Sequence, residues 1–366
     1  MRHSSAVCKT LPRGVFLAAL LLVCVLAGCG GASPQPTAAP RLIIYNWEDD
    51  LPQSVLDDFT AETGIQVETQ TYHSSQEALE SLRRGGVYDV VSLNSRYLPA
   101  AIGEGLVLPL NPARLTNFYH IDPSFRDLTF DPGNRYTVPY NWGVSGILFR
   151  RDLAGRELTR WADLWELGIE RGKIALWAGT PRDSIGLTLR SLGYSANSED
   201  PRHLEAARQR LLALRPQVVF VEDFGLGEEC SPLLESGEVT AALGYALDAW
   251  RAKPNPNIHF ALPQEGVVLW MENFLIPASS QNPEGAIQFL NYYLRPEVAA
   301  RIAAHNSYAT PNQNALPLID AEQLNDPVIY PPPQVLQNAE ILLPLSAAGE
   351  QQYTALWEEF LAGGAQ

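Results

Sequence analysis

The alternation of short β-rich runs with amphipathic helical segments, which begins at Arg41, restricts the fold of this chain more than any other feature. In the segment 52–63, Val55, Leu56 and Phe59 fall on one helical face, and Gly64 follows as a stop signal. We predict further helices over 76–84, 161–167, 182–192, 201–214, 283–294, 296–304 and 351–361. We predict strands over 41–46, 66–72, 89–93, 173–177, 217–221, 240–245 and 273–277. Strands separated by helices indicate an α/β fold with mostly parallel sheets flanked by helices.

The length of this α/β region predicts more than one compact part. Residues 41–366 are too many for a single hydrophobic core, since domains most often hold about 100–150 residues. The region contains no internal repeat that would predict a solenoid. Two α/β lobes are therefore the simplest arrangement.

Residues 1–28 have the composition of a secretory signal peptide. They contain three positively charged residues and no acid, and residues 15–26 form an uninterrupted apolar stretch. This stretch is too short for a comfortable membrane span, which needs about 20 residues. The motif Leu-Ala-Gly-Cys, which ends at Cys29, resembles the lipobox of bacterial lipoproteins. The resemblance implies that Cys29 is acylated and that residues 29–40 form a flexible, proline-rich tether. The alternative is a signal peptide that ends beside an unmodified cysteine.

Cysteine content argues against a disulfide-bonded fold, and net charge argues against a nucleic-acid-binding protein. After removal of the signal and modification of Cys29, only Cys230 remains, so no internal disulfide can form. The chain has a net charge of −15, and the loss of three positive residues with the signal leaves about −18. Such an acidic chain is not expected to bind nucleic acid, whose phosphates require a basic surface. It suits a cationic partner, although acidity often serves solubility alone.

The motifs of common enzymes are absent from the sequence. There is no phosphate-binding glycine loop, no dinucleotide fingerprint and no Gly-x-Ser-x-Gly turn. The six histidines are scattered without a metal-binding spacing, and Cys230 has no histidine near it in sequence. We therefore expect no catalytic residue, no metal and no cofactor.

A series of short motifs occurs in a fixed order along the chain. It begins with YNWEDDLPQSVLDDFTAETG at residues 45–64. The later motifs are YDVV (88–91), LTNF (115–118), VPYNWG (138–143), WADLW (161–165), LGYS (192–195), GEV (237–239), PQEG (263–266), WME (270–272), LRP (294–296) and YATPN (308–312). Each motif alone is weakly specific, but together the motifs extend nearly from Arg41 to the C-terminus. In this order they resemble the spermidine- and putrescine-binding proteins of bacterial ABC importers.

The resemblance implies a two-lobed binding protein whose ligand lies in a cleft between lobes that close by a hinge motion. Lobe 1 would comprise residues 41–139 and 272–318, and lobe 2 would comprise residues 140–271 and 319–366. The chain would then cross between the lobes near Tyr140 and near Glu272. The implied partners are a polyamine or related small cation, the permease and ATPase subunits of an importer, and a membrane reached through the lipid. We expect the protein to be a monomer.

The chemistry of a polyamine agrees with this resemblance. A methylene chain with an ammonium group at each end needs carboxylates at the ends of its site and flat apolar walls between them. Aromatic faces pack on methylenes and attract ammonium groups, and a desolvated contact of this kind contributes about 2 kcal/mol. A hydrogen bond to a charged group contributes about 1.5–3 kcal/mol. A few of each suffice for the roughly 8 kcal/mol of a micromolar binder.

Ten residues are candidates for the ligand site. The aromatic walls of the family match Trp47, Tyr245, Trp270 and Tyr308, and its carboxylates match Asp183 and Glu272, with glutamate in place of the usual aspartate at 272. The remaining candidates are Glu48, Asp49, Asn94 and Asp248. Each has a structural alternative: aromatic residues at strand ends are often core, and acids before or within a first helical turn often serve the helix dipole, as for Glu48, Asp49 and Asp183.

Three positions depart from the family pattern. Thr180 stands where the spermidine branch has an aspartate, and Asn94 and Arg96 stand where a serine and an aromatic residue are expected. A guanidinium at position 96 would repel a polyamine unless it points outward or pairs with one of the acids of the loop at 48–50. It equally suits a ligand that carries a carboxylate beside its amine. The alternatives to polyamine import are therefore the same fold with another amine, amino acid or zwitterion, a lipid-anchored enzyme, and a surface sensor.

Overall fold

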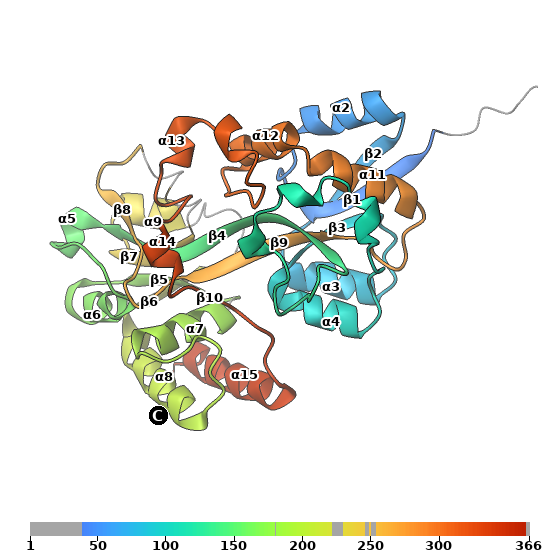
Figure 1. Cartoon of the computed structure of the whole chain (residues 1–366). Coiled ribbons are helices and arrows are strands. Elements are labelled where there is room, and N and C mark those ends of the chain that lie inside the picture. Colours follow the sequence, from blue (N-terminus) through green and yellow to red (C-terminus); the bar gives the residue numbers. More distant parts are fainter. Residues whose placement is uncertain (1–38, 180, 222–229, 246–248, 250–253, 364–366) are drawn as a thin grey trace, which may run out of the picture. The chain divides into compact units, whose positions relative to one another are not determined.

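The computed structural model describes residues 39–363 apart from 180, 222–229, 246–248 and 250–253 (Figure 1). Pro40–Gln366 forms one compact unit. Cys29 and the predicted signal peptide, like Thr180 and Asp248, lie outside the described residues. Within the described part of the chain, none of the helices combines the length and the apolar composition that a membrane crossing requires.

The N-terminal elements follow the alternation predicted from the sequence. Their bounds are β1 (Arg41–Trp47), α2 (Gln53–Thr63), β2 (Gln66–Tyr72), α3 (Ser75–Arg83) and β3 (Val90–Asn94). Helix α2 buries Val55, Leu56 and Phe59. It ends at Gly64, whose φ of 74° allows its amide to donate to the Thr60 carbonyl. The predicted helix face and stop signal are confirmed.

The strands of the described residues form one sheet in the order β2-β1-β3-β9-β4-β7-β5-β6, with β10 beside β9 and β8 beside β4. The additional strands are β4 (Thr137–Arg150), β5 (Ile174–Trp177), β6 (Val218–Val221), β7 (Ala241–Tyr245), β8 (Ile258–Ala261), β9 (Val268–Leu275) and β10 (Glu340–Ile341). The three strands at each end of this order are parallel to one another. The predicted α/β class with parallel strands is thus confirmed.

Two strands in the middle of the sheet, β4 and β9, join its parallel ends. They run antiparallel to each other along most of their length (Figure 1). Their register shifts between Pro139 and Asn141, so that Tyr140 is the extra residue of a β-bulge. Strand β4 is absent from the predicted strands, because Pro139 and two glycines lower its β propensity.

The glycines in β4 allow aromatic side chains to cross its surface. A Cβ atom at Gly143 would lie 2.4 Å from the Trp270 ring, and one at Gly146 would lie 2.4 Å from the Phe260 ring. Neither position therefore accepts a larger residue without displacing its aromatic neighbour. Glycine at 143 is what permits Trp270 of β9 to lie against β4.

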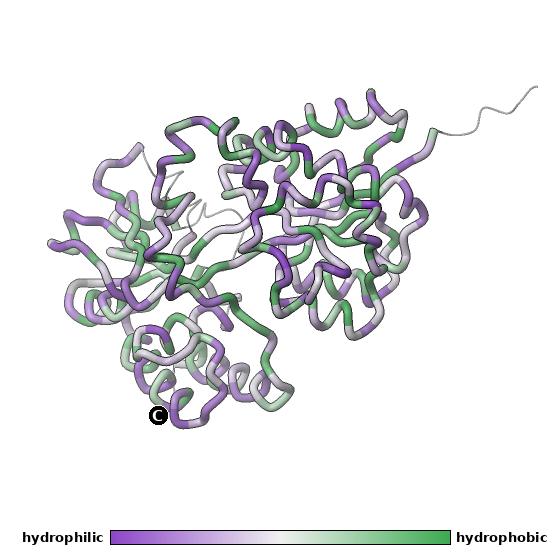
Figure 2. Tube along the Cα trace, viewed as in Figure 1, coloured by the Kyte–Doolittle hydropathy of each residue, from purple (hydrophilic) through white to green (hydrophobic). Residues whose placement is uncertain are grey.

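The remaining helices cover the sheet. They are α4 (Leu98–Gly103), α5 (Arg151–Ala154), α6 (Trp161–Arg171), α7 (Pro181–Ser191), α8 (Pro201–Leu214), α9 (Cys230–Ser236), α11 (Pro283–Tyr293), α12 (Pro296–Asn306), α13 (Ala321–Leu324), α14 (Pro333–Leu336) and α15 (Ala347–Leu361). Helix α8 has the predicted bounds and buries Leu204, Ala207, Leu211 and Leu214. Along α8 and α15, hydrophobic and hydrophilic residues alternate as helices with one buried side require (Figure 2).

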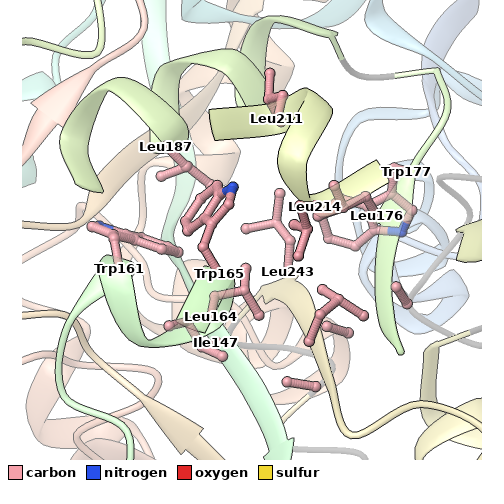
Figure 3. Packing of buried hydrophobic residues seen from close by; sticks show 14 of the residues in the cluster. Ile147, Trp161, Leu164, Trp165, Leu176, Trp177, Leu187, Leu211, Leu214 and Leu243 are labelled. Carbon is pink, nitrogen blue, oxygen red and sulfur yellow. The ribbon is translucent and has the colours of Figure 1, made fainter. Parts of the chain in front are cut away.

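Buried hydrophobic side chains group into three clusters. One contains residues of β5, β7 and the helices α6, α7 and α8, among them Trp165, Leu187 and Leu211 (Figure 3). The other two lie on β1, β3 and β9, with even-numbered residues such as Ile44 in one cluster and odd-numbered residues such as Tyr45 in the other. This alternation is the period of a strand buried on both faces. Cys230 is buried in the first cluster.

Candidate functional site

The candidate site begins where β1 and β3 end. These two strands are parallel, so Trp47 at the end of β1 and Asn94 at the end of β3 lie at the same edge of the sheet. Strand β9 runs antiparallel to β3 and places Glu272 directly opposite Asn94. Three of the predicted residues, from segments far apart in sequence, are thus brought together by strand pairing alone.

Glu272 is a buried carboxylate that is held by neutral donors. Asn94 Nδ2 donates to Oε1 over 2.9 Å, and Ser92 Oγ donates to Oε2 over 3.3 Å. Its side chain is 5% exposed, and burial raises its pKa to about 7, although hydrogen bonds from Asn94 and Trp47 work in the opposite direction. Among the described residues, none of the cationic side chains pairs with it. A cation that enters the site would stabilise the ionised form of such a carboxyl group.

Asn141, which the sequence analysis did not single out, lies beside Glu272. The bulge at Tyr140 shifts the register so that Asn141 faces Glu272 across the β4–β9 pair. Asn141 is buried, and its Oδ1 has no hydrogen-bond partner within the described part of the chain. A buried acceptor without a donor is costly unless something supplies one. An ammonium group, which has three N–H donors, can donate to both residues.

The first loop holds its acids in different environments. Glu48 and Asp49 are exposed, and Asp49 lies 3.4 Å from the ring of His305. Asp50 is buried and accepts hydrogen bonds from Asn46 and Asn306. Burial raises the pKa of Asp50, while bonds from Tyr140, Asn306 and Asn46 oppose that rise. Asp50 therefore fastens the loop to α12, whereas Glu48 and Asp49 remain open to solvent.

Aromatic rings continue from Glu272 along the site. Trp270 and Glu272 are two residues apart on β9, so their side chains leave the same face of the strand. The Trp270 ring lies edge-to-face with Tyr308, 4.9 Å between centroids, and with Tyr245, 6.2 Å between centroids. Tyr245 in turn stacks on Trp177 at 4.8 Å. The predicted aromatic residues Tyr245, Trp270 and Tyr308 therefore form one continuous group.

Asp183 lies at the other end of this aromatic group. It sits in the first turn of α7, and its Oδ1 accepts a hydrogen bond from the Tyr245 hydroxyl over 3.5 Å. Its Oδ2 pairs with Arg96 Nη1 at 3.3 Å. We call Glu272, Trp270, Tyr245 and Asp183 the row: Glu272 and Trp270 are two residues apart on β9, the Trp270 ring contacts Tyr245, and the Tyr245 hydroxyl donates to Asp183.

Other features of the structure lie apart from this row. A surface cavity of about 400 Å³ is lined by Arg151, Asp152, Gly155, Arg156, Glu157, Pro256, Asn257 and His259, and none of these belongs to the row. Within the described residues, no cluster of histidine, cysteine and acidic side chains has the arrangement of a metal site. The roles of the ten predicted site residues stay predictions, and Asp248 lies outside the described residues.

The family model and the relatives that this chain resembles all describe extracellular or periplasmic binding proteins. Residues 54–331 match the family model described as bacterial extracellular solute-binding protein. A spermidine/putrescine-binding periplasmic protein of Salmonella typhimurium is 35% identical over 303 residues, which cover 82% of this chain and 85% of that protein. The protein of the same name from Escherichia coli is 34% identical over 323 residues, covering 87% of this chain and 90% of that one.

A solved structure extends the likeness to three dimensions. The spermidine/putrescine ABC transporter substrate-binding protein of Streptococcus pneumoniae superposes with a TM-score of 0.80 at 30% identity. The superposition covers 89% of this chain and 99% of that one. These relatives are named as binding proteins, not as enzymes.

Proposed function

The chain belongs to the family of bacterial extracellular solute-binding proteins, and from this premise we propose that it binds a polyamine such as putrescine or spermidine for an ABC importer. The names of its relatives support this ligand class. The acidic charge of the chain favours a cationic ligand as well.

The observation that carries the proposal is the row of groups from Glu272 to Asp183. A carboxylate stands at each end, and the rings of Trp270 and Tyr245 stand between them. In the proposed complex, one ammonium group donates to Glu272 and to Asn141 Oδ1, which has no hydrogen-bond partner among the described residues. The methylenes pack on the aromatic rings, which exclude water and attract the ammonium groups.

We also propose how the site closes. Residues 41–139 with 272–318 would move as one lobe, and residues 140–271 with 319–366 as the other. The bulge at Tyr140, opposite Glu272, supports a hinge here, because bulges interrupt strand pairing and bend the strand. A ligand that contacts both lobes would then favour the closed form.

Export and anchoring complete the proposal. The signal-like residues 1–28 and the lipobox at Cys29 favour a lipoprotein held on the periplasmic or extracellular side of a membrane, where it delivers its ligand to the permease as a monomer. Mass spectrometry of the N-terminal peptide after expression in bacteria tests the anchor. A diacylglyceryl group on Cys29 is expected, and its absence together with an unacylated mature N-terminus would refute it.

The polyamine assignment is tested by calorimetry on a chain without residues 1–29, which lie outside the compact unit of residues 40–366. Putrescine, cadaverine, spermidine and spermine are titrated separately at pH 8. At least one is expected to bind with a micromolar dissociation constant. If all four bind no more tightly than millimolar, the assignment is wrong.

A zwitterionic ligand is the second candidate, and Arg96 is the observation that favours it. The guanidinium lies in the site and offers a partner for a carboxylate. However, it already pairs with Asp183, which reduces its capacity for a ligand. Native mass spectrometry of the purified protein tests this alternative, since a co-purified amino acid would be detected by its mass.

A further inference from the structure

Arg96 and Asp183 form an ion pair between segments that are 87 positions apart in the sequence. Arg96 follows β3 in the short helix at Ser95–Tyr97, and Asp183 belongs to α7. Nη1 of Arg96 lies 3.3 Å from Asp183 Oδ2, and Nη2 donates to the Tyr97 hydroxyl over 2.7 Å. The side chains are 24% and 14% exposed. The pair is therefore partly removed from water.

The guanidinium is a permanent positive charge in this position. Burial works to lower the pKa of Arg96, but attraction to Asp183 and Tyr97 outweighs it, so the pKa is raised above its usual range. The Tyr97 ring adds a second favourable contact, with the guanidinium carbon 4.8 Å from the ring centroid. Even without a ligand, the Arg96 guanidinium therefore contacts a carboxylate, a hydroxyl group and an aromatic ring.

The two ends of the site consequently differ. At Glu272, amide, hydroxyl and indole groups hold the carboxylate, and no cationic side chain of the described residues neutralises it. At Asp183, one oxygen already faces a cation and the other accepts from Tyr245. A ligand ammonium finds an uncompensated carboxylate at the first end and an ion pair at the second.

From this asymmetry, and resting on the proposed function, we infer that Arg96 determines specificity by acting as an internal counter-ion for Asp183. The second ammonium group of a ligand must displace the Arg96 guanidinium from Asp183, or it makes no ion pair with Asp183. In the wild type, the ratio of diamine to monoamine affinity, for the same carbon chain, is then smaller than it would be if both carboxylates were available to the ligand. Removal of the Arg96 charge frees Asp183 and increases that discrimination.

The test compares putrescine with butylamine, which has the same carbon chain but one ammonium group. Calorimetry is performed on the chain without residues 1–29, as wild type and as Arg96→Gln. A hydrogen bond between an ammonium and a carboxylate contributes about 1.5–3 kcal/mol, which corresponds to roughly 10- to 100-fold in affinity. Arg96→Gln is therefore expected to raise the ratio of putrescine to butylamine affinity by about 10-fold or more.

Arg83→Gln is the matched control, because it removes the same charge from an exposed position on α3 where Arg83 pairs with Glu80 and Glu104. It should leave the ratio unchanged. Asp183→Asn is the second variant, since it leaves Arg96 without its counter-ion. Its putrescine affinity and its ratio are both expected to fall below those of the wild type.

The outcomes separate this inference from the proposed function. An unchanged ratio in Arg96→Gln, with putrescine bound by the wild type, overturns the inference but not the function. An Asp183→Asn variant that binds putrescine as well as the wild type also overturns it. If the folded wild type binds none of putrescine, cadaverine, spermidine and spermine more tightly than millimolar, the proposed function itself is wrong.

Discussion

Glu272 is the residue whose environment explains most of the candidate site. It is buried among neutral donors and lies on the same strand face as Trp270. Beside it is Asn141, whose Oδ1 has no hydrogen-bond partner in the part of the chain that the structure describes. Burial raises its pKa to about 7. Its charge therefore depends on pH in the range where binding proteins are assayed, and two predictions follow from its protonation.

Binding of a cation is expected to weaken in acid, because a proton and an ammonium group compete for the Glu272 carboxylate. With a pKa of about 7 in the ligand-free protein, putrescine affinity should fall roughly 10- to 30-fold between pH 8 and pH 5.5. Calorimetry at the two pH values measures this. Glu170→Gln, an exposed site on α6, should show the same decrease as the wild type. Equal affinities at pH 8 and pH 5.5 would contradict the assigned role of Glu272.

The free energy of unfolding of the ligand-free protein should decrease as the pH rises. Since the folded pKa lies above the usual 4.5, the folded state keeps a proton that the unfolded state releases between those values. Stability from this group is thus fully present below pH 4.5 and is lost as the pH rises through about 7. Glu272→Gln carries no ionisable group and so avoids the cost of a buried charge at high pH. Its free energy of unfolding at pH 8 should therefore exceed that of the wild type by about 1–3 kcal/mol.

Urea unfolding at pH 5 and pH 8 tests this prediction. The advantage of Glu272→Gln should be smaller at pH 5, because the wild-type carboxyl is then largely protonated. The same variant should bind putrescine poorly. A variant that is less stable than the wild type at pH 8 would show that burial of the charge is not costly here.

Sequence and structure agree best on the placement of residues that belong to short motifs. Trp47, Trp270 and Glu272 came from short motifs, and strand pairing brings them together. Asn141 was missed because its position beside Glu272 depends on a one-residue bulge, which no periodicity reveals. The pairing of Arg96 with Asp183 was missed for a related reason, since it joins segments remote in sequence.

At the scale of elements, strands β4 and β9 organise the molecule, and only part of β9 was predicted. Helix α8 and strand β2 have their predicted bounds, because each has a regular pattern between clear stop signals. Strand β4 interrupts the strand pattern with Pro139, Gly143 and Gly146, and the two glycines leave room for the rings of Trp270 and Phe260. Its sequence therefore resembles a loop although it lies in the centre of the sheet.

Gly143→Ala is predicted to displace the Trp270 ring, since the new Cβ would lie 2.4 Å from that ring. The displacement should cost about 1–3 kcal/mol in the free energy of unfolding and should weaken putrescine binding. In a double-mutant cycle, Trp270→Ala should weaken binding less in the Gly143→Ala background than in the wild type. Gly103→Ala, where no atom lies within 4 Å of the new Cβ, serves as control. Additive effects on binding would contradict the coupling of these two residues.

At the scale of the whole molecule, the proposed hinge predicts a ligand-dependent shape. Closure around putrescine should lower the radius of gyration measured by small-angle X-ray scattering. Saturating ligand at 100 times its dissociation constant should also add about 2.7 kcal/mol to the free energy of unfolding. A gain in stability without a change in the radius of gyration would support binding but argue against the hinge at Tyr140.

The central claim is that Glu272 receives an ammonium group of the ligand while the neighbouring rings hold its methylene chain. A crystal structure of the protein with putrescine tests this most directly. We predict an amine nitrogen within hydrogen-bonding distance of both the Glu272 carboxylate and Asn141 Oδ1, with the chain lying along Trp270. Putrescine bound elsewhere, with Glu272 still contacted only by Asn94, Ser92 and Trp47, would contradict the account.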